Sequence, residues 1–146
     1  MSVKIKVISE SRYGLPEYAH IGDSGMDVRA NTDNPITLKS LERYIFPTGI
    51  FVEIPEGYEI QVRPRSGLAA KHGISVCNTP GTVDSNYRGE IKIILVNLSP
   101  DPYTIEPGER IAQLVLAKVE KAELDVTVNI SDTSRGGTGF GDSGRF

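Results

Sequence analysis

Four short segments, in which apolar residues alternate with polar ones or form nearly continuous runs, constrain the fold of this chain most. Val3–Val7 and Tyr58–Arg63 alternate, whereas Ile91–Val96 and Ile111–Leu116 are almost wholly apolar. A period of two is that of a β-strand, and short apolar runs suit strands buried on both faces. Turn signals such as Pro55–Gly57 separate the segments. The pattern predicts an all-β domain of the sandwich, jelly-roll or barrel type.

One stretch departs from this pattern and predicts a short helix over residues 66–73. Ser66 is a good N-cap, and Gly73 is a good C-terminal stop. A helix N-terminus offers unpaired N–H groups, Arg65 adds a forked donor for phosphate oxygens, and Gly67 lets a ligand approach the backbone. The segment is therefore a candidate anion site, although an ordinary capped helix with a surface arginine explains the same residues.

The chain has 146 residues, which predicts one domain with a real core. Apolar runs end near residue 131, so we place the β core at 1–132 and a flexible glycine-rich arm at 133–146. Half of positions 135–144 are glycine. Glycine amides can wrap phosphate oxygens, an arginine can pair with them, and a ring can stack on a base. Composition alone favours a disordered terminus without a function.

Charge and cysteine content narrow the class of protein. The net charge is −3, which predicts no nucleic-acid partner. No apolar run approaches membrane-spanning length, so we expect no membrane partner. The single cysteine, Cys77, rules out a disulfide within the chain and fits a reducing compartment, and its apolar flank predicts a buried thiol. We expect a soluble, cytoplasmic protein.

Three isolated polar residues are candidates for chemistry. Asp84, expected in a short strand, can serve a turn or can deprotonate a water. Tyr87 can pack in the core or lie under a sugar, and Asp27 can serve a turn or hold a hydrated Mg²⁺. Two distant histidines and a cysteine without a CxxC partner argue against zinc, and the chain has no GxxxxGK[ST] phosphate loop.

Five segments, in order, resemble the motifs of the trimeric dUTP diphosphatases (dUTPases): "DSGMDVRA", "PRSGLAAKHGI", "GTVDSNYRGEI", "GERIAQLVL" and "RGGTGFGDSG". They span residues 23–144. The resemblance implies a distorted jelly roll and Mg²⁺-dependent hydrolysis of dUTP to dUMP and diphosphate by water attack at the α-phosphate. It also implies a homotrimer. Each active site would take the first, second and fourth motifs from one subunit, the third from a neighbour and the tail from the remaining subunit.

The resemblance also assigns roles to residues. It implies that Asp84 activates the water, that Tyr87 lies under the deoxyribose, and that Asp27 contacts the metal through water. Residues implied to bind substrate are Asn78, Gly81, Thr82, Val83 and Lys92 at uracil, Arg65, Ser66, Gly67 and Gln113 at the phosphates, and Arg135, Phe140, Gly141 and Ser143 in the closing tail.

Two alternatives stay open. A dCTP deaminase would share the fold, but it needs a glutamate a few residues into the strand after the hairpin, and no acidic residue lies between Glu90 and Asp101. A dUTP-gated regulatory binding module would keep the nucleotide site and use it as a switch. Thr138 stands where the family commonly has glycine, and Phe146 ends the sequence soon after the motif.

Overall fold

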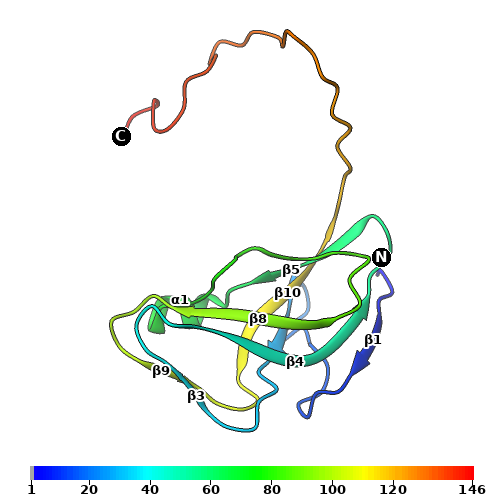
Figure 1. Cartoon of the computed structure of the whole chain (residues 1–146), viewed down its shortest axis with the longest axis vertical. Coiled ribbons are helices and arrows are strands. Elements are labelled where there is room, and N and C mark those ends of the chain that lie inside the picture. Colours follow the sequence, from blue (N-terminus) through cyan, green and yellow to red (C-terminus); the bar gives the residue numbers. More distant parts are fainter. Residues whose placement is uncertain (1) are drawn as a thin grey trace.

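The computed structural model describes residues 2–146 and consists of short strands with one short helix (Figure 1). This confirms the predicted all-β, jelly-roll-like fold. Along the chain the elements are β1 (Lys6–Ser9), β2 (Gly25–Arg29), β3 (Ile36–Leu38), β4 (Arg43–Glu53), β5 (Tyr58–Arg63), α1 (Ser66–His72), β6 (Ile74–Val76), β7 (Gly81–Val83), β8 (Glu90–Asn97), β9 (Tyr103–Ile105) and β10 (Arg110–Lys118).

The strands form two four-stranded sheets and one two-stranded sheet. The strand orders are β1-β4-β8-β6, β2-β10-β5-β7 and β3-β9, and every pair is antiparallel. Neighbouring strands are thus mostly distant in sequence, as Figure 1 shows for β4 beside β8. Residues brought together on one sheet therefore come from several motifs.

The core lies between the inward faces of the two larger sheets. In β8, Ile91, Ile93 and Leu95 are at most 1% exposed, whereas Lys92 between them is exposed. The prediction that this run is buried on both faces is therefore wrong for β8, which alternates. It holds for β10, where the neighbours Leu114 and Val115 are both buried. Among residues 2–146, no helix combines the length and apolar character needed to cross a lipid bilayer.

Three local predictions need correction. The helix begins at Ser66 with Arg65 at the N-cap position, and no side chain caps it, so the predicted Ser66 cap is wrong. Cys77 is exposed, because β6 ends at Val76 and the chain turns away from the core. Asp84 lies just after β7 instead of within a strand. The predicted stop at Gly73 is confirmed, since its φ of 66° closes the helix in the left-handed conformation.

The first strand starts three residues later than its alternation predicts. β1 begins at Lys6, which pairs with Glu53 of β4 and forms an ion pair of 2.8 Å with it. Residues 2–5 precede the ladder and form no strand. The alternation is thus real, but the partner strand β4 determines which residues are paired.

Beyond β10 the chain contains no further strand up to residue 146 and runs away from the sheets (Figure 1, orange to red). The last strand ends at Lys118, before the predicted core boundary at 132. Within this segment apolar residues alternate with polar ones and are 88–96% exposed: Leu124, Val126, Val128 and Ile130. A strand-like pattern therefore continues into a part of the chain that has no partner strand here.

Candidate active site

The first group of predicted site residues lies around β7, β8 and the turn between them, which we call the hairpin. They line one cavity of about 230 Å³: Asn78, Gly81, Thr82, Val83, Asp84, Tyr87 and Lys92. β7 lies at the edge of its sheet, paired only to β5, so its other backbone edge stays available to a ligand. A flat ligand with hydrogen-bonding edges can pair with such an edge.

Short-range contacts fix the ring of Tyr87 in this cavity. The Tyr87 hydroxyl donates to the backbone oxygen of Glu90 at 2.8 Å, and the Tyr87 backbone amide donates to the backbone oxygen of Asp84 at 3.1 Å. A Cβ on Gly89 would lie 2.4 Å from the Tyr87 hydroxyl, so only glycine allows this ring position. Arg88 ties down the turn by donating to the Ser85 oxygen at 2.7 Å.

Glu90 locks this hairpin to β4, a role that the sequence did not reveal. Its carboxylate accepts backbone hydrogen bonds from Thr48 at 3.2 Å and Gly49 at 2.9 Å, where the β4–β8 register shifts. Gly49 has a φ of 69°, and a Cβ there would lie 2.7 Å from the Ser11 backbone nitrogen. Because the partner amides are 41 and 42 residues away, no local pattern identifies this contact.

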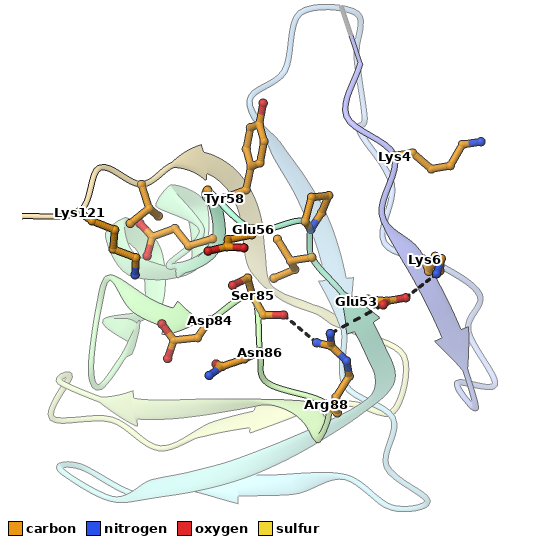
Figure 2. A pocket seen from close by; sticks show the side chains of 15 residues that line it. Lys4, Lys6, Glu53, Glu56, Tyr58, Asp84, Ser85, Asn86, Arg88 and Lys121 are labelled. Atoms are coloured by element: carbon orange, nitrogen blue, oxygen red, sulfur yellow. Dashed lines mark hydrogen bonds and ion pairs between the residues drawn. The ribbon is translucent and has the colours of Figure 1, made fainter.

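Asp84 lies where two cavities meet. It lines the small hairpin cavity and also a larger one of about 900 Å³, drawn in Figure 2, beside Glu56 and Lys121. Among residues 2–146 its carboxylate makes no hydrogen bond and no ion pair, and it is exposed. An unpaired carboxylate of this kind can accept a proton from a water molecule.

Two cations that line the larger cavity are paired with Glu53 instead of Asp84. Figure 2 shows Glu53 between Lys6 and Arg88, with N–O distances of 2.8 and 3.8 Å. The hydrogen bond and charge of Lys6, with a smaller contribution from Arg88, lower the pKa of Glu53. Lys6 and Arg88 are thus engaged by Glu53 and do not pair with Asp84.

The second group lies on the sheet formed by β2, β10 and β5. Asp27 is half-buried between two arginines, with its oxygens 3.1 Å from Arg65 Nε and 3.2 Å from an Arg110 nitrogen. Arg65 also donates to the Arg110 backbone oxygen at 3.2 Å. The sequence reasoning missed Arg110, which comes from the fourth motif and reaches Asp27 across 83 residues of chain.

Gln113 lies directly opposite Asp27 in the strand register and shares this face of the sheet. Its side-chain nitrogen donates to the Pro64 oxygen at 2.9 Å. A Cβ on Gly25 would approach the Gln113 side-chain oxygen to 2.1 Å, so this glycine makes room for the glutamine. Gly25 is a second residue that the sequence reasoning missed, and only the cross-strand pairing explains it.

Ser66 and Gln113 line a shallow groove of about 440 Å³ beside this group. A Cβ on Gly67 would meet nothing within 4 Å, so the backbone at the start of α1 is open to a ligand. The structure therefore places Asp27, expected at the metal, beside the residues expected at the phosphates, namely Arg65, Ser66, Gly67 and Gln113.

Asp27 fits a hydrated Mg²⁺ better than a directly bound ion. Each of its oxygens accepts one arginine hydrogen bond, and an ionised carboxylate has about four acceptor positions, so sites for water remain. Among residues 2–146, no three His, Cys, Asp or Glu side chains cluster as a metal cage. Mg²⁺ commonly keeps several waters and uses few protein ligands, which matches this arrangement.

The third group, in the arm, is not brought to either cavity within one chain. Phe140 is fully exposed, and Arg135 donates only to the nearby Thr138 oxygen at 3.0 Å. Gly141 and Ser143 are exposed as well. Among the described residues, no hydrogen bond or ion pair joins positions 133–146 to the strands.

Comparison with protein families identifies relatives along nearly the whole chain. The dUTPase family model matches residues 12–144. The chain is 61% identical over 143 residues to the deoxyuridine 5'-triphosphate nucleotidohydrolase of Fusobacterium nucleatum subsp. nucleatum, covering 98% of each chain. It is 56% identical over 142 residues to the enzyme of that name from Finegoldia magna, covering 97% of this chain and 99% of that one.

Solved structures give the same family. The fold resembles the Staphylococcus bacteriophage 80alpha dUTPase with dUPNHPP, with a TM-score of 0.88, 28% identity and coverage of 99% and 100% of the two chains. It also resembles a mutant dUTPase from phage phi11 of S. aureus, described with a structural Mg(II) ion. That likeness has a TM-score of 0.79 and 23% identity over 89% of this chain and all of the phage chain, and it supports the fold alone.

Proposed function

Because the chain belongs to the dUTPase family and hydrolyses dUTP to dUMP and diphosphate, we propose that Asp84 is the general base of this reaction. The exposed, unpaired Asp84 carboxylate between two cavities is the observation that carries the assignment. Asp84 accepts a proton from a water molecule, and the water oxygen bonds to the α-phosphorus. The bond from that phosphorus to the bridging oxygen breaks, and diphosphate leaves with its electron pair.

Base and sugar selection belong to the hairpin cavity. The Asn78 side chain and the open edge of β7, with the backbone at Lys92, pair with the polar edge of uracil. Tyr87, held by its hydrogen bond to Glu90 and by Gly89, packs under the sugar and leaves no room for a 2′-hydroxyl. Cytosine presents a donor where uracil presents an acceptor, so buried groups would be left unpaired.

The phosphates lie on the second group of residues. Arg65, Ser66, Gly67 and Gln113 contact the phosphate oxygens, and Asp27 would hold a hydrated Mg²⁺ through water. When bound, Mg²⁺ neutralises and orients the phosphates. Arg110 shares Asp27 with Arg65 and thereby fixes the carboxylate.

Assembly as a homotrimer would complete each site. Within one chain the arm contacts neither the hairpin cavity nor the phosphate group, so a complete site needs an arm supplied by another copy. The exposed alternation over residues 124–130 suits packing onto a neighbouring copy. Residues 133–146 form a mobile arm that closes over a site, where Arg135, Gly141 and Ser143 contact phosphate and Phe140 stacks on uracil.

We also propose that the protein acts in the cytoplasm. Cys77 is exposed and unpaired, which suits a reducing compartment. The comparisons do not favour the deaminase or the purely regulatory alternative.

A substrate panel tests the specificity of the site. The purified protein is incubated with Mg²⁺ and dUTP, dCTP, dTTP or UTP, and diphosphate and ammonia are measured. Two unpaired buried groups, at about 1–3 kcal/mol each, predict roughly 10²–10⁴-fold preference for dUTP over dCTP. Equal hydrolysis of dUTP and UTP would contradict the role of Tyr87, and release of ammonia from dCTP would support the deaminase.

Subunit mixing tests the shared site. An Asp84→Asn protein and a protein truncated before Arg135 are each expected to be nearly inactive. After reassembly some sites would combine an intact Asp84 with an intact arm, and activity would return. Continued inactivity, with subunit exchange shown by tagged copies, would mean that one chain supplies both elements.

A further inference from the structure

We propose that Arg63 is an additional phosphate-binding residue that contacts the diphosphate portion of dUTP, the part that leaves. The inference rests on the proposed function of the site and adds a residue outside the five motif segments. Arg63 is the last residue of β5 and is exposed.

Strand register places Arg63 on the same face as the phosphate group. Arg63 is paired with Gln113 of β10, and Gln113 is paired with Asp27 of β2. Side chains directly opposite one another on antiparallel strands share a face of the sheet. The residues next to Arg63 and Gln113, namely Val62 and Leu114, are buried on the other face. Arg63, Gln113 and Asp27 therefore form a row across three strands on the outer face.

Arg63 also shares a cavity with residues assigned to phosphate. It lines the groove of about 440 Å³ together with Ser66 and Gln113. An anion in this groove would lie beside a hydroxyl, an amide and a guanidinium, which are the donors that phosphate oxygens require.

Charge distinguishes Arg63 from the other arginines nearby. Arg65 and Arg110 both pair with the Asp27 carboxylate, so their charges are partly neutralised. Among residues 2–146, Arg63 forms no ion pair, and two of its three guanidinium nitrogens donate instead to the Gln61 side-chain oxygen at 3.0 and 2.6 Å. Gln61 in turn donates to Glu59 at 2.7 Å. A neutral amide thus orients the guanidinium and leaves its charge available to an anion.

The residues that line the two cavities assign the diphosphate portion to this groove. The nucleoside and the α-phosphate lie at the hairpin cavity, since Asp84 must direct the attacking water there. The groove with Arg63 also contains Ser66 and Gln113, which the proposed function assigns to the phosphates, so it receives the phosphates beyond the scissile bond. Binding there would stabilise the negative charge that develops on the leaving group.

The test compares Arg63→Gln and Arg63→Lys with Arg43→Gln, which removes the same charge from β4 of the other four-stranded sheet. Inhibition constants of diphosphate and of dUMP are measured alongside kcat and KM for dUTP in the intact protein. Diphosphate carries only the groups assigned to the groove, and dUMP carries only the α-phosphate. Size and melting temperature show that each variant is folded and assembled.

We expect Arg63→Gln to weaken inhibition by diphosphate about 10-fold and to raise KM for dUTP, because a charge-assisted, forked contact is lost. Inhibition by dUMP should not change. Arg63→Lys should recover part of the diphosphate affinity, and Arg43→Gln should match the unaltered protein.

Unchanged inhibition by diphosphate in a folded, active Arg63→Gln protein would overturn the inference, as would equal weakening of diphosphate and dUMP. If the unaltered protein failed to hydrolyse dUTP, the proposed function itself would fail. The two failures are therefore distinguishable.

Discussion

The strands of the core and the segment after β10 carry the same alternating pattern but differ completely in burial. Ile93 in β8 is fully buried, whereas Val126 beyond β10 is 96% exposed. β8 has a partner on each side, β4 and β6, and the later segment has none among residues 2–146. Alternation therefore predicts a strand only where another edge is available to pair with it.

The comparison separates what stabilises the fold from what completes the site. Residues of the core bury apolar side chains within one chain, and each fully buried Ile or Leu contributes about 1.5–3 kcal/mol. Ordering the arm costs about 1–2 kcal/mol per residue, and glycine loses the most freedom. The arm can therefore be ordered only by something outside its own chain segment, such as a neighbouring copy or the nucleotide.

The largest effect on turnover should come from Asp84, an exposed residue of the β-strand domain. Asp84→Asn preserves shape but removes the charge that accepts the proton, so turnover should fall roughly 10²–10⁴-fold. Binding of a non-hydrolysable dUTP analogue and the melting temperature should be nearly unchanged. Near-normal turnover in this variant would show that the base is another residue.

A buried residue of the same core should affect stability instead. Ile93→Ala leaves a cavity in the centre of β8 and should lower the free energy of unfolding by about 2–5 kcal/mol. Denaturant unfolding at fixed protein concentration measures the loss. The control Ile21→Ala changes a fully exposed side chain and should cost less than about 0.5 kcal/mol. Similar losses in the free energy of unfolding at both positions would mean that Ile21, exposed in one chain, is buried in the assembled protein.

Removing the arm should lower turnover and leave stability unchanged, the opposite of the effect expected for Ile93→Ala. A chain ending before Arg135 should keep its size and melting temperature, because no hydrogen bond or ion pair joins residues 133–146 to the strands within the described part of the chain. Turnover should fall about 100-fold, the scale at which misplaced phosphates slow a reaction. A truncated protein that is folded, assembled and fully active would show that the arm is dispensable.

The smallest effect should come from one ring in the arm. Phe140→Ala should weaken dUTP binding by about 1–3 kcal/mol, the contribution of one stacked base. Phe146 is a similarly exposed ring outside the assigned set, so Phe146→Ala is the matched control. Calorimetric titration with a dUTP analogue should separate them, and equal losses would exclude a specific stacking role for Phe140.

Local sequence predicted the elements and the chemistry well. Alternation over Tyr58–Arg63 matches β5 at both ends, and Gly73 ends the helix as predicted. The family motifs predicted the dUTPase family, which the comparisons confirm. The individual roles of the site residues stay predictions. All these signals are local, because a strand period, a left-handed glycine or a motif needs only neighbouring residues.

Other features were decided only when distant segments came together. Exposure of Cys77 depends on where β6 ends, and the true register of β1 depends on β4. Glu90 reaches Thr48 and Gly49 across the β4–β8 pair, and Arg110 reaches Asp27 through the β10–β2 pair. Such contacts depend on strand register, which no short window of sequence contains. The sequence by itself thus determined the strand content and the reaction, and the tertiary structure decided which side chains hold the site in place.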